Sequence, residues 1–260
     1  MKYETIRVEL DDNLALITLN RPEKRNARSP LLVEDLCHAF QELELAELVR
    51  AVILTGEGDA FCAGADLAHL QAISQYGRRD NIRDSQAIAG LFQSIYAFPR
   101  PVIAAVNGPA LAGGCGLATV CDLVLAAEET ARFGYTEVKI GFVPAIVLNF
   151  LLRRVGGVAA RELALTGRVI DARRALELGL INEAVPRDRL LERARDIAQA
   201  IAEETSGEAV AATKWLMNEL DGRTLRDGLA LAVDTNVESR ASAACQYGIR
   251  CFLNKEKPEW

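Results

Sequence analysis

The sequence has few of the residues that metal sites and disulfide frameworks need. Its 260 residues include six dispersed cysteines, none of them in a C-x-x-C pair, and only two histidines. This pattern excludes a zinc ribbon and a disulfide scaffold, and it favours reduced thiols in a cytoplasmic protein. We therefore expect no metal site.

Long apolar runs and long basic runs are also missing. No stretch reaches the roughly 18 apolar residues of a membrane-spanning helix. The start of the chain lacks the apolar segment of a signal peptide. The formal net charge is −6 and no lysine or arginine run stands out, which argues against a nucleic-acid footprint. We expect a protein with neither a membrane nor a nucleic-acid partner.

The most informative features present are two glycine-bearing segments, residues 61–67 and 107–117. Each follows a strand-like run (49–55 and 101–106) and leads into a helix-forming stretch. Small residues let backbone N–H groups approach a ligand closely, and a helix start leaves N–H groups unpaired at its positive end. Two such loops converging on one point would form an oxyanion hole, which stabilises a carbonyl oxygen as it gains charge.

These segments carry a family resemblance, together with residues 19–22 (Leu-Asn-Arg-Pro), 26–27 (Asn-Ala) and 252–255 (Phe-Leu-Asn-Lys). The chain resembles the crotonase superfamily, the enoyl-CoA hydratase/isomerase family, over nearly its whole length. The resemblance implies an α/β fold, a crotonase-like spiral of ββα units with a helical C-terminal oligomerisation region. Residues 1–190 would form the core with the acyl-CoA site, and residues 191–260 would make the contacts of a homotrimer or hexamer.

The chemistry implied by the resemblance acts on an acyl-CoA thioester and needs no cofactor, because coenzyme A is part of the substrate. By match, the backbone N–H groups of Ala65 and Gly113 hold the thioester carbonyl, and Glu137 is the acid/base. A mostly apolar pocket would raise the pKa of Glu137 toward a useful range. The alternative is a surface glutamate paired with Lys139, although residues two apart on a helix do not face each other.

The resemblance also assigns contacts to coenzyme A. The first loop would bind the thioester arm and adenine, and many relatives have lysine at the position of Ala68. Phe252 and Lys255 would reach coenzyme A bound to a neighbouring subunit. A basic cluster of Lys24, Arg25 and Arg28 is a further hypothesis for the nucleotide phosphates. The full set of expected substrate-binding residues is Ala63, Ala65, Asp66, Leu67, Ala68, Gly113, Gly116, Phe252 and Lys255.

Gly116 departs from the pattern of the usual hydratases, which carry a first glutamate at this position. A positioned acid/base group contributes a factor of about 10²–10⁴ to the rate, so hydration, which usually uses two glutamates, would be weakened without one of them. Isomerisation, which moves a double bond, needs only one carboxylate that removes and returns a proton. Residues 145–148, bulky and apolar where hydratases are usually glycine-rich, either narrow the pocket or improve helix packing. Residues 136–139 nevertheless resemble the hydratase and methylglutaconyl-CoA hydratase branch.

Three functions follow as alternatives. We predict 2-enoyl-CoA hydration first and Δ3,Δ2-enoyl-CoA isomerisation second. The alternative from another class is a non-catalytic homologue that binds acyl-CoA.

Several other polar residues are predicted to be structural. Asp66 is predicted to cap a helix. Asp122 is predicted to accept hydrogen bonds from backbone groups at the start of a strand. Cys62 and Cys115 read as small packing residues. No partner is evident for His69.

The expected elements follow from periodicity and capping signals. Ser29 and Pro30 signal the start of the first long helix. Residues 68–84 read as a mobile, polar surface segment. The expected strands are 6–10, 14–19, 49–55 and 101–106, and the expected helices are 29–48, 82–97, 187–204, 209–220 and 225–252.

Overall fold

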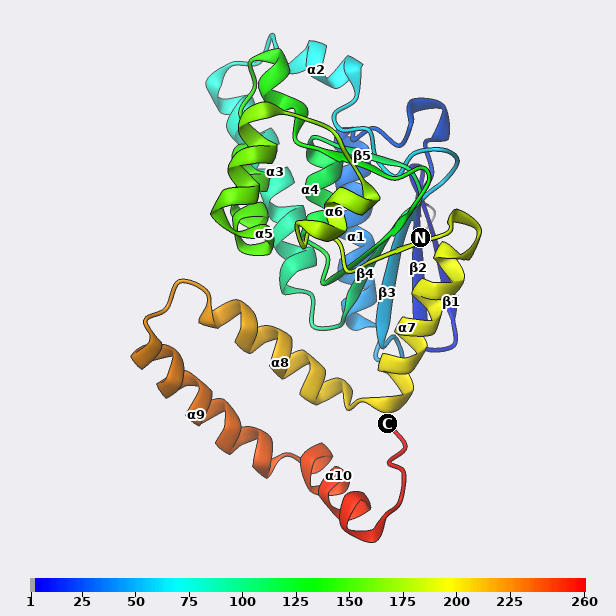
Figure 1. The fold of residues 1–260 in the computed structure, drawn as a ribbon, viewed down its shortest axis with the longest axis vertical. Coiled ribbons are helices and arrows are strands. Elements are labelled where there is room, and N and C mark those ends of the chain that lie inside the picture. The colour runs from blue at the N-terminus through cyan, green and yellow to red at the C-terminus, as the bar shows by residue number, and fades with distance from the viewer. Residues whose placement is uncertain (1–2) are drawn as a thin grey trace.

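The computed structural model describes residues 3–260 and contains a six-stranded sheet with the strand order β1-β2-β3-β4-β6-β9. β1 and β2 form an antiparallel hairpin, and every later strand joins its neighbour in parallel. Figure 1 shows strands β1, β2, β3 and β4 of this sheet side by side, next to α7. Its strands are β1 (Ile6–Asp11), β2 (Leu14–Leu19), β3 (Ala51–Gly56), β4 (Val102–Val106), β6 (Leu123–Ala127) and β9 (Glu183–Val185).

A smaller sheet with the order β5-β7-β8 lies next to the second glycine-bearing loop. Its strands are β5 (Pro109–Leu111), β7 (Arg132–Gly134) and β8 (Ile170–Asp171). β5 follows β4 closely in the chain and runs parallel to β7. The helices are α1 (Pro30–Leu45), α2 (Leu67–Ile73), α3 (Arg78–Ala97), α4 (Gly113–Thr119), α5 (Ala145–Thr166), α6 (Ala172–Glu177), α7 (Leu190–Glu204), α8 (Gly207–Leu220), α9 (Leu225–Ala241) and α10 (Ala243–Asn254), with 3-10 turns η1 (Pro22–Lys24), η2 (Thr136–Ile140) and η3 (Arg187–Arg189).

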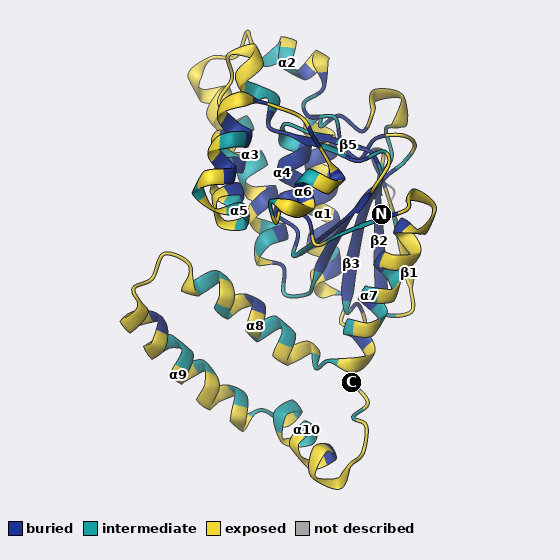
Figure 2. Cartoon of the chain, in the orientation of Figure 1, coloured by how far each residue is buried: buried dark blue, intermediate teal, exposed yellow. Residues whose placement is uncertain are grey.

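The large sheet is apolar on both faces because helices cover both of them, as parallel sheets require. Successive side chains of a strand point to opposite faces. In β3, Val52 and Leu54 enter the main core with residues of α1 and α3. Ala51 and Ile53 enter a second core, which Ala198 and its neighbours on α7 complete. Strands β2, β3 and β4 are accordingly buried along their whole length (Figure 2), whereas the edge strand β1 is largely exposed.

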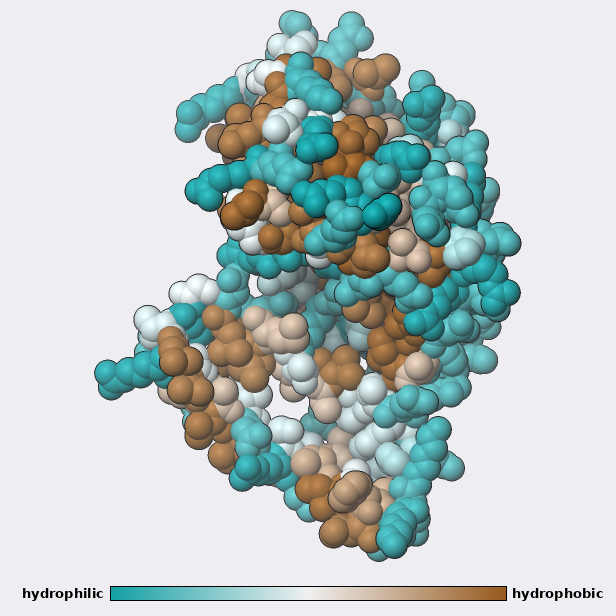
Figure 3. Space-filling view, in the orientation of Figure 1, coloured by the Kyte–Doolittle hydropathy of each residue, from teal (hydrophilic) through white to brown (hydrophobic). Residues whose placement is uncertain are grey.

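Helices α8, α9 and α10 form an arm that extends away from this body (Figure 1). Most of the arm is exposed or only partly buried (Figure 2). Its surface carries many apolar side chains (Figure 3). The exposed apolar residues of the arm include Trp215, Met217, Leu225, Leu229, Val233, Val237, Ile249, Phe252 and Leu253.

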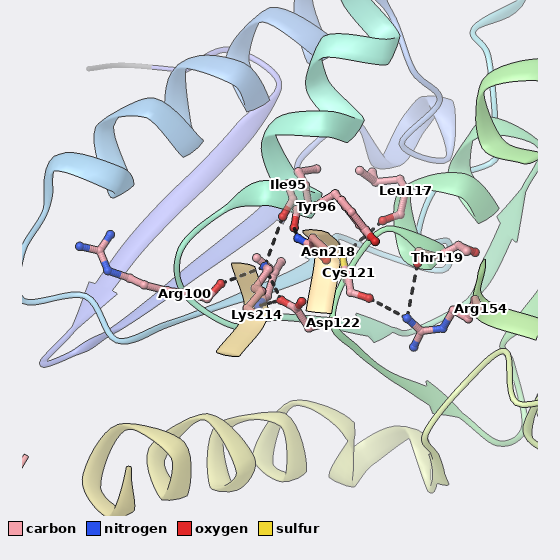
Figure 4. Close-up of polar contacts among 11 residues, drawn as sticks. Ile95, Tyr96, Arg100, Leu117, Thr119, Cys121, Asp122, Arg154, Lys214 and Asn218 are labelled. Atoms are coloured by element: carbon pink, nitrogen blue, oxygen red, sulfur yellow. Dashed lines mark hydrogen bonds and ion pairs between the residues drawn. The ribbon is translucent and has the colours of Figure 1, made fainter. Parts of the chain in front are cut away.

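An ion pair between a buried lysine and a half-buried aspartate attaches the arm to the body. The Nζ of Lys214 on α8 lies 2.7 Å from Oδ2 of Asp122, and the same oxygen accepts a hydrogen bond of 2.7 Å from the backbone N–H of Val102 at the start of β4. Asn218 adds a hydrogen bond of 3.0 Å to the carbonyl of Tyr96 (Figure 4). The structural role predicted for Asp122 is confirmed. Helix α8 is held against the body by Lys214 and Asn218.

The helix start predicted from the capping residues is confirmed, whereas some helix ends predicted from the apolar pattern differ from the structure. The hydroxyl of Ser29 accepts a hydrogen bond of 3.2 Å from the N–H of Leu32, as predicted, although α1 ends at Leu45 rather than at residue 48. Residues 68–84 lie mostly on the surface, as predicted, but α2 and the first residues of α3 occupy most of this segment, and α3 begins at Arg78 rather than at residue 82.

The single helix predicted over 225–252 is wrong. It is two helices, α9 and α10, which meet at Ser242. Ser242 has an extended backbone, and its hydroxyl accepts a hydrogen bond of 3.1 Å from the N–H of Cys245. A serine in this conformation caps a new helix, so the apolar pattern continues while the backbone turns.

Candidate functional site

The two glycine-bearing loops lie against each other. Cys62 donates its N–H to the carbonyl of Pro109 at 3.1 Å, and its own carbonyl accepts from Leu111 at 3.0 Å. Gly114 sits on the same residue, since a Cβ there would overlap the carbonyl oxygen of Cys62. Only glycine permits this approach, and the contact fixes the start of α4 beside the first loop.

The residues that precede the two predicted donors are also in contact. Gly64 has a φ of 97°, and a Cβ on it would lie 3.2 Å from the Cβ of Ala112. Ala112 has the unusual backbone angles φ 48° and ψ −126°; such strain is typical of sites where geometry serves function. Within residues 3–260, neither the N–H of Ala65 nor that of Gly113 makes a hydrogen bond. The arrangement brings two free donors into one region, with the N-terminus of α4 behind Gly113.

The first loop is held from its other side by the segment before α1. Arg28 donates its N–H to Gly64 at 2.6 Å, and its carbonyl accepts from Asp66 at 2.9 Å. Asp66 caps α2 through a hydrogen bond of 2.9 Å from Ala68, as predicted. It also forms an ion pair of 2.7 Å with Arg21. The hydrogen bond from Arg21 lowers the pKa of Asp66, so this carboxylate stays ionised and holds the loop.

Glu137 lies on η2, half-buried, and its Oε2 is buried without a hydrogen-bond partner. Burial raises the pKa of Glu137, whereas a backbone hydrogen bond and the charge of Arg28 act in the opposite direction. In the described chain Lys139 forms no ion pair with Glu137, and its side chain is exposed. A carboxyl group with a raised pKa and a free oxygen is suited to proton transfer.

The space beside Gly116 is filled by other side chains. A Cβ on Gly116 would overlap Cγ1 of Val147 and lie 3.1 Å from the ring of Phe92. Val147 belongs to the bulky apolar stretch that opens α5, and it is buried. The apolar stretch therefore does more than pack its own helix, because it occupies the space that a side chain at position 116 would need.

The remaining predicted binding residues lie at different distances from the loops. Ala63 is part of the first loop, where its N–H donates to the carbonyl of Arg25 at 3.1 Å. Leu67 and Ala68 are exposed at the start of α2. Phe252 is 82% exposed on α10, and α10 lies at the opposite end of the molecule from α2 (Figure 1). Phe252 and Lys255 therefore do not meet the loops of their own chain.

The three residues of the predicted basic cluster, Lys24, Arg25 and Arg28, do not lie together. Lys24 and Arg25 are exposed. The guanidinium of Arg28 instead turns toward the second loop, where a Cβ on Gly113 would lie 3.3 Å from its Nε. No local pattern predicts this orientation, because Arg28 and Gly113 are far apart in the chain.

His69 has a partner that the sequence did not reveal. Its Nε2 lies 2.9 Å from Oδ1 of Asp84, and the His69 side chain is buried. The pair bridges α2 and α3 at the edge of a cavity of about 340 Å³ that Arg28 also lines.

The cysteines of the two loops serve packing, as predicted. Cys62 and Cys115 are fully buried. Burial raises the pKa of both thiols, that of Cys115 to about 12. A thiol with so high a pKa is a poor nucleophile.

Metal-binding clusters and membrane spans are absent from the described part of the chain. Residues 3–260 contain no group of three or more His, Cys, Asp or Glu side chains that could hold a metal ion. Over the same residues, no helix has both the length and the apolarity needed to cross a bilayer.

Comparisons with known proteins show which family the chain is similar to. Residues 9–260 match the model of the family described as enoyl-CoA hydratase/isomerase. A Thermus thermophilus protein named as an enoyl-CoA hydratase is 46% identical over 248 residues, which cover 95% of this chain and 97% of the relative. The crotonyl-CoA hydratase of Syntrophomonas wolfei is 35% identical, with 99% and 98% covered.

A solved structure gives the same assignment for the fold. The crystal structure of an enoyl-CoA hydratase from Mycobacterium smegmatis is similar with a TM-score of 0.93 and 32% identity, covering 99% of each chain. The predicted α/β crotonase-like fold is therefore confirmed. The chain belongs to the enoyl-CoA hydratase/isomerase family, within the crotonase superfamily.

Proposed function

We propose that this protein hydrates 2-enoyl-CoA thioesters, with Glu137 as its acid/base and the N–H groups of Ala65 and Gly113 as its oxyanion hole. The observation that carries the proposal is the buried, unpartnered Oε2 of Glu137. Arg28 supports placing the two unpaired donors near Glu137, because a Cβ on Gly113 would lie 3.3 Å from its Nε and its charge acts on Glu137. The names of the relatives support the same activity.

In this scheme one carboxylate performs both proton transfers. Glu137 takes a proton from water as the water oxygen bonds to C3 of the enoyl group, and the C2–C3 π electrons pass to the thioester oxygen. The N–H groups of Ala65 and Gly113 stabilise that enolate oxygen, and each such donor is typically worth about 3–4 kcal/mol of barrier. Protonated Glu137 then returns the proton to C2, so that the hydroxyl group of the water ends on C3 and its proton on C2.

The Gly116 and Val147 pair supports a second candidate, Δ3,Δ2-enoyl-CoA isomerisation. Val147 fills the space of a further acid, and isomerisation does not need that acid. Glu137 would remove a proton from C2 of a 3-enoyl-CoA and return it to C4, while the same oxyanion hole holds the dienolate. Activity on 3-enoyl substrates alone would favour this reaction.

The C-terminal arm supports an oligomeric enzyme. Residues 1–190 would form the core with the acyl-CoA site, and residues 191–260 would make the contacts of a homotrimer or hexamer. The exposed apolar side chains of α8, α9 and α10 support this assignment. Phe252 and Lys255 would then serve the coenzyme A of a neighbouring subunit. We expect the enzyme to act in the cytoplasm, in fatty acid metabolism.

The test is product analysis with two substrates. Purified protein is incubated with crotonyl-CoA or with 3-hexenoyl-CoA, and the thioesters are identified by mass spectrometry. We expect 3-hydroxybutyryl-CoA from crotonyl-CoA. Conversion of 3-hexenoyl-CoA without any hydration would establish the isomerase instead. Binding of both thioesters with no turnover would contradict both proposals and leave a non-catalytic homologue.

A further inference from the structure

Arg28 connects the residues of the two predicted oxyanion donors. Its backbone pairs with Ala65 of the first loop in a parallel bridge. Its side chain reaches the second loop, where a Cβ on Gly113 would lie 3.3 Å from Nε and 3.4 Å from Nη2. One residue just before α1 is therefore in contact with both loops, which are far apart in the chain.

The backbone of Arg28 sets the direction of the first donor. Its N–H binds the carbonyl of Gly64 at 2.6 Å, and its carbonyl accepts from the N–H of Asp66 at 2.9 Å, so the loop is held on both sides of Ala65. In a planar trans peptide the carbonyl and the following N–H point in opposite directions, and the peptide bonds of residues 3–260 are all trans. Because the carbonyl of Gly64 points toward Arg28, the N–H of Ala65 points away from it.

The side chain of Arg28 places a positive charge beside the second donor. The Nε–Nη2 edge of the guanidinium is packed against Gly113, and Nε is buried without a hydrogen-bond partner. Across the described residues 3–260, no carboxylate lies within ion-pair distance of this guanidinium. Burial lowers the pKa of Arg28, but an arginine remains charged near neutral pH. Its field is therefore not neutralised by a direct partner.

Three titratable groups face this charge, namely Cys62, Asp84 and Glu137. The thiol of Cys62 stays neutral because burial raises its pKa, and Oδ1 of Asp84 lies 2.9 Å from Nε2 of His69. Burial raises the pKa of Glu137, and the charge of Arg28 opposes this change. The same arginine thus touches the residue of one donor, directs the other and acts on the proposed acid/base.

We infer that Arg28 is a positioning residue of the proposed reaction, which fixes the two oxyanion donors relative to each other and places a positive charge beside the enolate they bind. The inference rests on the proposed function, because it takes the thioester oxygen to lie between the N–H groups of Ala65 and Gly113. A fixed charge favours the transition state over the bound substrate, since the negative charge on this oxygen develops only during the reaction.

The test uses two variants of Arg28. Arg28→Met keeps an unbranched apolar stem and removes the charge, whereas Arg28→Lys keeps the charge without the planar guanidinium. With crotonyl-CoA, Arg28→Met should lower kcat about 10- to 100-fold and change KM less than about threefold, as the loss of an interaction made in the transition state does. Arg79→Met is the matched control, because Arg79 is exposed on α3, and it should match wild type.

The pH profile of kcat/KM separates this role from one in folding alone. Its acid limb reports the ionisation of the acid/base in the free enzyme. Removal of the cation raises the pKa of Glu137, so the acid limb should move to higher pH in Arg28→Met and remain near that of wild type in Arg28→Lys. An acid limb that does not move in Arg28→Met would overturn the inference, and so would equal losses of kcat in Arg28→Met and Arg79→Met.

Acetoacetyl-CoA separates this inference from the proposed function, because it ionises to an enolate and is not a substrate for hydration. The ultraviolet absorbance of the bound enolate is followed as the pH is raised. The enolate should form at lower pH on wild type than on Arg28→Met. This result with no turnover of crotonyl-CoA would contradict hydration and keep the role of Arg28. Coincident enolate titrations on wild type and Arg28→Met would contradict the role of Arg28.

Discussion

Val147 occupies the space into which any side chain at position 116 would extend. A Cβ on Gly116 would overlap its Cγ1, and Val147 is 4% exposed in the main core. The absence of a side chain at position 116 is thus built into the packing between α4 and α5. A glutamate placed at position 116 would therefore displace Val147.

The first prediction concerns this pair. Gly116→Glu should lower the free energy of unfolding by about 1–3 kcal/mol, because it overpacks the contact between α4 and α5. Adding Val147→Ala to Gly116→Glu should recover part of that loss, whereas Val147→Ala alone should be destabilising because it leaves a cavity. Urea unfolding of the three variants measures the coupling. Equal stability of Gly116→Glu and wild type would show that the contact does not exclude a side chain.

Glu137→Gln should lower the rate of turnover by about 10²–10⁴, the usual contribution of a positioned acid/base. The change keeps the shape of the side chain and removes its ability to exchange a proton. Lys139→Gln is the matched control, since this side chain is exposed on the same 3-10 turn. Comparable losses in the two variants would contradict the role of Glu137.

The stability of the same Glu137→Gln variant should rise with pH relative to that of wild type. Burial raises the pKa of Glu137 in the folded protein, so wild type binds its proton more tightly when folded and loses stability as the pH rises from about 4.3, the ordinary value, through the raised value. Glutamine does not titrate. Thermal unfolding across this range should show the advantage of the variant growing with pH and then levelling off. A variant whose advantage shrank with pH would contradict the direction of the pKa shift.

Gly114→Ala should separate the two loops, because a Cβ there would overlap the carbonyl of Cys62. Displacing one oxyanion donor should lower the rate by about 10²–10³. Gly90→Ala is the control, since Gly90 is exposed in α3 with no atom within 4 Å of an added Cβ. That control should raise stability by about 0.5–1 kcal/mol and leave activity unchanged. Full activity in Gly114→Ala would remove the case for converging loops.

Lys214→Met should destabilise the protein by about 1–3 kcal/mol, between the values for exposed and fully buried ion pairs, because Asp122, whose side chain is 30% exposed, is left without its cation. The exposed pair of Arg223 and Glu219, at 2.6 Å on the same arm, supplies the control. Arg223→Ala should change stability by less than about 1 kcal/mol. Chemical unfolding of both variants at one protein concentration makes the comparison. Similar small losses would mean that the arm is not fixed through Lys214.

Local signals in the sequence were enough to predict much of the fold. Ser29 and Asp66 carry capping side chains, and both caps lie where the pattern placed them. The break at Ser242 was missed, because the apolar pattern runs on through the turn between α9 and α10. Capping chemistry is local, whereas a change of helix direction depends on tertiary packing.

The candidate site was less accessible from sequence, because its decisive contacts join distant segments. Neither the fit of Val147 against Gly116 nor the pairing of His69 with Asp84 has a local signature. The orientation of Arg28 toward Gly113 is of the same kind. The roles of Ala65, Gly113 and Glu137 came from family resemblance, and they stay predictions.

The measurement that tests the account most directly uses crotonyl-CoA in ¹⁸O-labelled water, with mass spectrometry of the thioester products. We predict that wild type places the label in 3-hydroxybutyryl-CoA and that Glu137→Gln loses this product. Labelled product formed equally by wild type and Glu137→Gln would contradict the role of the single carboxylate. No labelled product from wild type would contradict hydration itself.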